Sequence, residues 1–146
     1  MAVGGGGLIS GIGKYLKEVG SKADVIACWP DNAKALYHCM ARGEIYDVPE
    51  TETLSDGTAG GIEEGAITLP ICQQVIDRNI FISEAEIASA MRDMATHESF
   101  MIEGSAGVAV AAGLKDASRY KGLKVAVVVC GRNITLDKFI NAIEQV

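Results

Sequence analysis

The sequence predicts a single α/β domain over residues 1–146, with a mostly parallel sheet flanked by helices. Its 146 residues suffice for one ordinary domain and are too few for two. Apolar residues make up 49% and charged residues 22%, which is enough apolar material for a sizeable core. Short apolar runs alternate with segments of helical period, and this alternation favours parallel strands covered by helices on both faces.

The first half of the chain shows strand and helix signals in turn. Val25–Trp29 is an apolar run closed by Pro30, as expected of a buried strand. Gly43 is the expected stop of the helix after it. In order, we expect a helix from about Leu8, a strand over 25–29, a helix over 32–42, a polar, Gly-rich loop over 45–61, a helix over 66–77 and a strand over 79–82.

The second half begins with the S-x-x-E form of a capping box at Ser83 and Glu86. The helix behind it is expected to face the core with Ile87, Met91 and Met94, and a small-residue helix is expected over 105–119. Val125–Val129 is an uninterrupted apolar run of four valines and one alanine, which predicts a central strand buried on both faces. A final helix is expected from about Thr135, with Leu136, Phe139, Ile140 and Ile143 along it.

Charge and cysteine usage exclude several classes of protein. Thirteen basic and 19 acidic residues give a net charge of −6, which argues against nucleic-acid binding and against a polybasic membrane-surface protein. No apolar run reaches the roughly 18 residues of a membrane span, and the N-terminus lacks the pattern of a signal peptide, so we expect a cytoplasmic protein. Four widely spaced cysteines predict free thiols and no metal site (Cys28, Cys39, Cys72 and Cys130).

The strongest local signal is the glycine run Gly4-Gly5-Gly6-Gly7, followed by Leu8. Such a run frees the backbone to point several N–H groups at one spot, and a helix starting there adds its positive end, so together they predict a phosphate cradle. A flexible tail or a tight packing turn is the alternative. The P-loop and dinucleotide glycine patterns do not fit. An unrelated nucleotide binder would need an acidic residue about 20 positions after the glycine run, at the end of a strand, to bind a ribose. Asp24 lies at that distance, but it begins a strand instead of ending one.

Three further motifs follow the glycine run: Ser55-Asp56-Gly57, Glu103–Gly107 and Cys130-Gly131-Arg132-Asn133. In this order and at these intervals, the set resembles the fold type II (tryptophan synthase beta-like) pyridoxal-phosphate (PLP) enzymes over the whole chain. Within them it is most similar to the serine/threonine dehydratase group, which includes serine racemase and a dehydratase-like protein of hydroxyectoine use. The resemblance implies an α/β large-domain fold, PLP as cofactor and an ammonia-lyase activity.

The resemblance also implies site residues. Gly4, Gly5, Gly6, Gly7 and Leu8 match the loop that binds the cofactor phosphate, Glu103 matches a glutamate near the cofactor ring, and Cys130 matches the residue that meets the pyridine nitrogen. Asp56 and Gly57 match a loop near the active site, and Arg132 stands where a second glycine is usual. Trp29 and Ala35 replace the two acids of the family's metal motif, so no metal is expected.

The resemblance further implies that the Schiff-base lysine of the family lies well before the glycine run. Lys14 does not match it, because it lies roughly 9 Å along the expected helix, away from its N-terminal end. We therefore expect the C-terminal part of a dehydratase, truncated at the N-terminus, with no catalytic residue of its own and inactive alone. A non-catalytic oligomeric domain or gene remnant is the alternative. We expect uncovered apolar sheet edges to bring a second copy, as a dimer, or a complementary N-terminal half.

Overall fold

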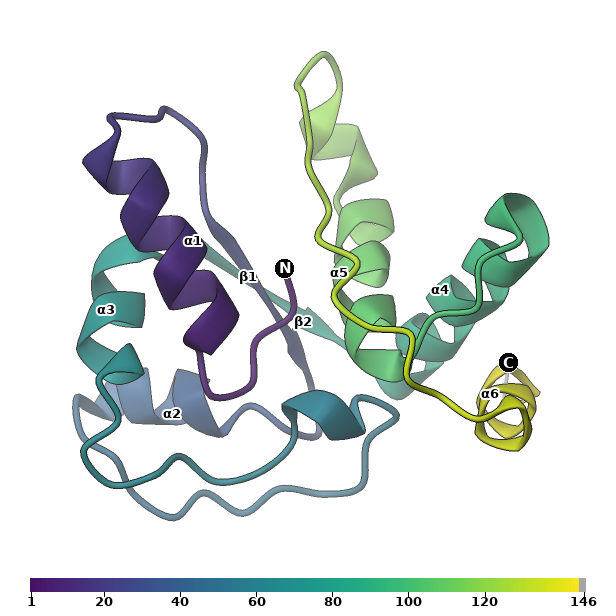
Figure 1. Ribbon diagram of the computed structural model, residues 1–146, viewed down its shortest axis with the longest axis horizontal. Coiled ribbons are helices and arrows are strands. Elements are labelled where there is room, and N and C mark those ends of the chain that lie inside the picture. The colour runs from purple at the N-terminus through teal and green to yellow at the C-terminus, as the bar shows by residue number, and fades with distance from the viewer. Residues whose placement is uncertain (145–146) are drawn as a thin grey trace.

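The computed structural model describes residues 1–144 and has two parallel strands among eight helical segments (Figure 1). The order along the chain is α1 (Gly7–Glu18), β1 (Ile26–Pro30), α2 (Ala35–Arg42), the 3-10 turn η1 (Asp56–Thr58), α3 (Thr68–Val75), β2 (Arg78–Ile82), α4 (Glu84–Glu98), α5 (Gly104–Lys115), the 3-10 turn η2 (Ala117–Tyr120) and α6 (Leu136–Ile143).

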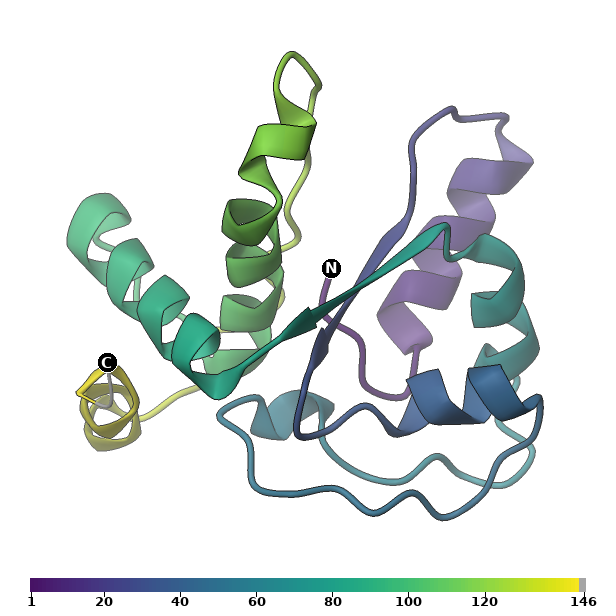
Figure 2. The same cartoon turned by 180° about the vertical axis from the view of Figure 1, so that it is seen from behind.

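The two strands pair in parallel, with Ile26 opposite Arg78 and Pro30 opposite Ile82. Both views show α1, α2 and α3 together on one side of the strands, and α4, α5 and α6 on the other (Figures 1 and 2). The polypeptide between the strands supplies α2 and α3, as a parallel connection requires. The fold is therefore the α/β arrangement expected from the sequence.

Each side of the strand pair has its own apolar core, because successive side chains of a strand point to opposite faces. Ala27 and Trp29 of β1 pack with Leu36 of α2 and Cys72 of α3. On the opposite side lie mainly residues of β2, α4, α5 and α6 (Ile80, Ile82, Ile87, Met91, Ala106, Val108 and Phe139). Ala2 packs in one core and Val3 in the other, so the two cores position the N-terminal residues beside β1.

Several expectations are confirmed within small shifts of their ends. The strands over 25–29 and 79–82 are present, and Gly43 ends α2 in the left-handed conformation. Ser83 accepts a hydrogen bond from the Glu86 N–H while the Glu86 carboxylate accepts one from the Ser83 N–H, so the capping box is formed. The helix expected over 32–42 begins only at Ala35, and the helix expected over 105–119 ends at Lys115, followed by η2.

The central strand expected at Val125–Val129 is wrong for the described chain. Residues 121–135 form no strand within residues 1–144, and Val125, Val127 and Val129 are 49%, 41% and 37% exposed. A strand requires a neighbour with which to exchange backbone hydrogen bonds, and strand propensity cannot replace that neighbour. No backbone hydrogen bond joins residues 124–130 to another part of the described chain. The segment instead runs beside α5 (Figures 1 and 2).

Candidate functional site

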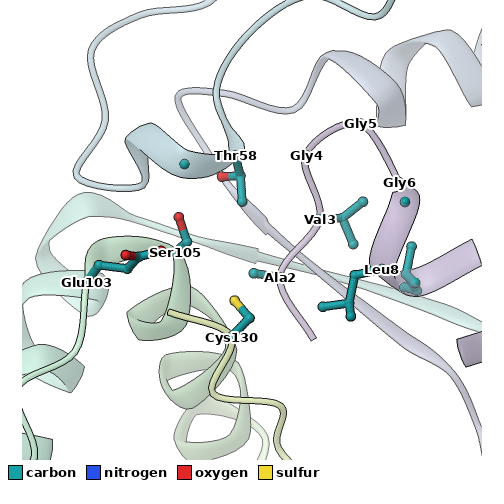
Figure 3. A pocket seen from close by; sticks show the side chains of 13 residues that line it. Ala2, Val3, Gly4, Gly5, Gly6, Leu8, Thr58, Glu103, Ser105 and Cys130 are labelled. Atoms are coloured by element: carbon teal, nitrogen blue, oxygen red, sulfur yellow. The ribbon is translucent and has the colours of Figure 1, made fainter. Parts of the chain in front are cut away.

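The glycine run, the η1 loop and the start of α5 surround one cavity of about 260 Å³ (Figure 3). Its lining includes every residue that the sequence assigns to cofactor binding (Gly4, Gly5, Gly6, Gly7, Leu8, Glu103 and Cys130). These residues come from three separate parts of the chain: the glycine run near the N-terminus, the start of α5 and the segment after Val129. The fold therefore brings together the motifs that the sequence presents far apart.

The glycine run forms a turn that leads directly into α1. Gly6 caps this helix with φ +83°, in the left-handed region that glycine adopts without strain. A side chain at Gly4 would collide with the backbone of Thr58, so the run also allows two loops to approach closely. The first turn of α1 contains no acidic residue, and Gly6 provides no capping side chain. The helix start thus presents N–H groups and a partial positive charge to the cavity.

The opposite wall is the η1 loop, which is anchored to neighbouring helices through hydrogen bonds. The Leu54 N–H donates a hydrogen bond to the Glu84 carboxylate at the start of α4, at a distance of 2.6 Å. The buried Ser55 hydroxyl lies 2.6 Å from the Thr58 hydroxyl and 3.4 Å from that of Ser105. Thr58 and Ser105 both line the cavity. This wall therefore adds fixed hydroxyl groups to a site whose other side is backbone.

Glu103 stands at the start of α5 and reaches over the backbone of the 131–133 turn. Its Oε2 accepts a hydrogen bond from the Asn133 N–H at 2.8 Å, and the Gly131 carbonyl accepts one from the Glu103 N–H at 3.3 Å. A side chain at Gly131 would overlap the Glu103 carboxylate, which would have to move and give up its present position over the turn. Glu103 therefore holds Cys130 and the residues after it against α5.

Cys130 contributes a thiol to the cavity although it remains exposed. Partial desolvation raises the pKa of this thiol above its ordinary value; a backbone hydrogen bond opposes that rise, and the negative charge of Glu103 adds to it. A raised pKa keeps the thiol protonated at neutral pH. The side chain is then an uncharged group able to donate or accept a weak hydrogen bond.

The structure also separates residues that the motifs group together. Asp56 does not line the cavity; its carboxylate is exposed and lies 3.5 Å from the Lys138 ammonium. The Arg132 guanidinium lies over the Phe100 ring, 4.4 Å from its centre, and is not part of the cavity lining. Thr58 and Ser105 were not singled out as site residues from the sequence. Their signal was available, since both stand inside or directly beside quoted motifs.

The two residues that replace the acids of the metal motif, Trp29 and Ala35, are both buried in the core. Trp29 is fully buried, and its indole N–H donates to the Asn79 side chain at 2.9 Å. Within residues 1–144 no three His, Cys, Asp or Glu side chains gather as a cation site would require. The absence of a metal site therefore remains a prediction from the sequence.

No helix within residues 1–144 is both long and apolar enough to traverse a bilayer.

Comparison with known proteins matches residues 1–131 to the family model described as pyridoxal-phosphate dependent enzyme. The L-threonine ammonia-lyase of Thermotoga maritima is 34% identical over 142 residues, which is 95% of this chain and 35% of that protein. The structure of serine racemase from Dictyostelium discoideum superposes with a TM-score of 0.79 at 31% identity, covering 92% of this chain and 43% of the other.

The processed form of threonine deaminase isoform 2 from Solanum lycopersicum superposes with a TM-score of 0.86 at 26% identity, covering 98% of this chain and 42% of that one. The chain thus spans about a third of the length of the first curated relatives that it matches. It covers 35% of one and 32% of the other. It is a threonine dehydratase- and serine racemase-like domain that corresponds to part of a longer enzyme.

Proposed function

The chain belongs to the pyridoxal-phosphate-dependent enzyme family, and we propose that it supplies the cofactor-binding part of a serine/threonine dehydratase, an ammonia-lyase. The observation that carries the proposal is the convergence of Gly4–Gly7, Glu103 and Cys130 on one cavity. Family membership removes the alternative of an unrelated nucleotide binder.

The lining fits the phosphate end of PLP in charge and in space. Gly5 and Gly7 line the cavity, and extra atoms at either residue would meet nothing within 4 Å, so the turn is not closed off by neighbouring side chains there. The backbone N–H groups of the turn and the start of α1 suit a phosphate, because a helix N-terminus attracts anions. The volume of about 260 Å³ is close to the lower end of the ~300–1,000 Å³ usual for ligand pockets. Further walls of the site are therefore proposed to come from the rest of the enzyme.

The ring end of the cofactor is proposed to lie at Cys130 and Glu103. PLP, when bound, supplies an electron sink that stabilises negative charge on a substrate carbon. Cys130 offers the ring nitrogen a neutral partner, since its pKa is raised. Glu103 keeps the Cys130 turn in place through the Asn133 N–H. Thr58 and Ser105 provide hydroxyl groups at the same wall.

The lysine that holds the cofactor covalently is proposed to lie outside this sequence. Among residues 1–144 no lysine lines the cavity. Lys14 lies on the later part of α1, where its ammonium forms an ion pair with Glu18 at 3.0 Å. On this basis the chain binds the cofactor phosphate but leaves the covalent anchor and proton transfer to the remainder of the enzyme.

The test is a titration of the chain with PLP, followed by absorbance and by mass after borohydride reduction. Gly4→Ala places a methyl group against the Thr58 backbone and is expected to weaken PLP binding by roughly tenfold or more, equivalent to about 1.4 kcal/mol. Gly61→Ala, at an open position, is the matched control and should bind as the unchanged chain does. Circular dichroism checks that both variants fold.

After borohydride reduction, we expect no single lysine of the chain to carry one covalently attached PLP per molecule. If one does, the chain carries its own covalent anchor and the assignment of the lysine to another part is wrong. If Gly4→Ala and Gly61→Ala bind PLP equally well, the glycine run is not the phosphate cradle.

A further inference from the structure

We propose that Glu50 is a positioning residue of the cofactor cavity: its carboxylate anchors the loop that carries the η1 wall, and this anchor keeps the wall against the glycine run. Glu50 does not line the cavity, and it belongs to none of the motifs that identify the site. The inference rests on the proposed function, because it gives Glu50 a part in building the same cavity.

The η1 turn is too small to fix its own position. It consists of only three residues, none of which is buried. The backbone hydrogen bonds donated by Thr58 and Ala59 end inside the turn, so they hold its shape and not its place. On its N-terminal side, the turn is tied to α4 and α5 through the Leu54 N–H and the Ser55 hydroxyl. Its C-terminal side needs an attachment of its own.

Glu50 provides the attachment on the C-terminal side. One oxygen of its carboxylate accepts a hydrogen bond from the Gly60 N–H at 2.7 Å, and the other accepts one from the Ala35 N–H at 2.9 Å. Ala35 is the first residue of α2, and the side chain of Lys34 before it makes no capping hydrogen bond. A single carboxylate thus satisfies an N–H group at the start of a helix and holds the loop that follows η1.

The segment that carries this carboxylate is itself tied to the end of the sheet. The Thr51 N–H donates to the Asn32 carbonyl at 3.0 Å, and the Asn32 side-chain amide donates to the Glu52 carbonyl at 2.7 Å. Just before this turn, the Asp31 N–H donates to the Ile82 carbonyl of β2 at 2.8 Å. The carboxylate therefore stands on a fixed base, and a loop bound to it is placed relative to the strands.

The backbone conformation of Gly60 fits this attachment. Its φ of +125° lies in the region that favours glycine, whereas a side chain there would meet nothing within 4 Å. Crowding therefore does not explain a glycine at this position, but the conformation does. In this conformation the Gly60 N–H reaches Glu50.

The anchored loop meets the glycine run at Thr58, two residues before Gly60. A Cβ atom at Gly4 would lie 2.8 Å from the Thr58 carbonyl oxygen, so the two loops are in close contact (Figure 3). Release of Gly60 lets Thr58 move away from Gly4. A ligand must then order the wall as it binds, and this cost weakens its binding.

The test is hydrogen exchange of the amides of residues 58–60, without PLP, in the unchanged chain and in two isosteric variants. Glu50→Gln replaces a charged acceptor by a neutral one and should speed exchange of these amides by roughly tenfold or more. Glu52→Gln makes the same change at an exposed residue two positions away and should leave exchange unaltered. In the absorbance titration, the PLP affinity of Glu50→Gln should fall about fivefold or more, and that of Glu52→Gln should not change.

Gly60→Ala breaks the same contact from the side of the loop. Alanine disfavours a φ of +125°, although space for its methyl group is open. This variant should speed exchange at Thr58 and Ala59 as Glu50→Gln does, and the two changes together should add little to either alone. Gly61→Ala, at a neighbouring open position without a positive φ, is its matched control.

Equal exchange at residues 58–60 in the unchanged chain and in Glu50→Gln overturns the proposal. An equal increase in Glu52→Gln also overturns it, because the effect would then come from net charge alone. Faster exchange without any loss of PLP affinity shows that the loop does not serve the cavity. If the unchanged chain binds no PLP, the proposed function fails, whereas the exchange measurement still decides whether Glu50 holds the wall.

Discussion

Val25–Trp29 and Val125–Val129 are both short, uninterrupted apolar runs, and both predict a buried strand. The first is buried at nearly every position and forms β1, whereas the second is exposed and forms no strand within the described residues. The difference lies in their neighbours. β1 has β2 on one edge and residues 1–3 on the other, and the later run has α5 at its back but no strand at its side. Composition makes a run fit for a sheet, and a hydrogen-bonding partner decides whether it joins one.

The first run is also fixed by two side chains, one directly before β2 and one within it. The Val25 N–H donates to the Asp77 carboxylate at 2.7 Å, and the Trp29 indole donates to Asn79 at 2.9 Å. The same carboxylate binds the Lys17 ammonium of α1 at 2.7 Å. The strand is therefore tied to both its neighbouring strand and a covering helix.

The largest expected contrast is between Trp29→Ala and Val127→Ala. Removing the fully buried indole leaves a large cavity and an unpaired Asn79, so the free energy of unfolding should fall by about 3–5 kcal/mol. Removing two methyl groups from the exposed Val127 should change it by no more than about 0.5 kcal/mol. Urea unfolding followed by circular dichroism measures both. Comparable losses would show that the second run is packed as tightly as the first.

The contrast between the two apolar runs also shows which parts of the fold could be predicted from the sequence. The capping box at Ser83, the stop at Gly43 and both paired strands depend on local patterns or on partners inside the chain, and they are found close to their expected places. The strand expected at Val125–Val129 has no hydrogen-bonded neighbour among the described residues. No property of those five residues could have revealed that.

The candidate site divides in a similar way. Gly4–Gly7, Glu103 and Cys130 were identified because each belongs to a motif, and the cavity contains all of them. Thr58 and Ser105 enter the site through the packing of the η1 loop on α5, with the buried Ser55 hydroxyl between them. The motifs contain or adjoin both residues, but which motif residues face the cavity is decided by this contact between segments 50 positions apart. The orientation of Asp56, away from the cavity, is likewise set by the fold.

A smaller effect is expected from Asp77→Asn, which weakens the anchor of β1. Desolvation raises the pKa of Asp77, but hydrogen bonds from Lys17 and the Val25 N–H, together with the Lys17 charge, lower it below its ordinary value. A lowered native pKa stabilises the fold above the unfolded value of about 3.9, and this stabilisation disappears as pH falls through the native value. Asp77→Asn should therefore be less stable than the unchanged chain at pH 7, with the gap narrowing below about pH 4.

Urea unfolding between pH 3 and pH 7 measures that gap. Asp47→Asn, on an exposed loop residue, is the matched control and should show no comparable loss at pH 7. A gap for Asp77→Asn that stays constant down to pH 3 would mean that the ion pair and the charged hydrogen bond do not anchor the strand.

The smallest effect concerns the cysteines of the two runs and leaves stability unchanged. Cys28 lies buried inside β1, whereas Cys130 is exposed just after Val129, so iodoacetamide should label Cys130 first among the four thiols. Because the pKa of Cys130 is raised, partly by Glu103, its labelling rate should still increase above pH 9. Glu103→Gln removes the negative charge and should shift that rise to lower pH. If Glu103→Gln leaves the pH profile unmoved, the carboxylate does not control the thiol, and Glu103 acts on Cys130 only by positioning the turn after it.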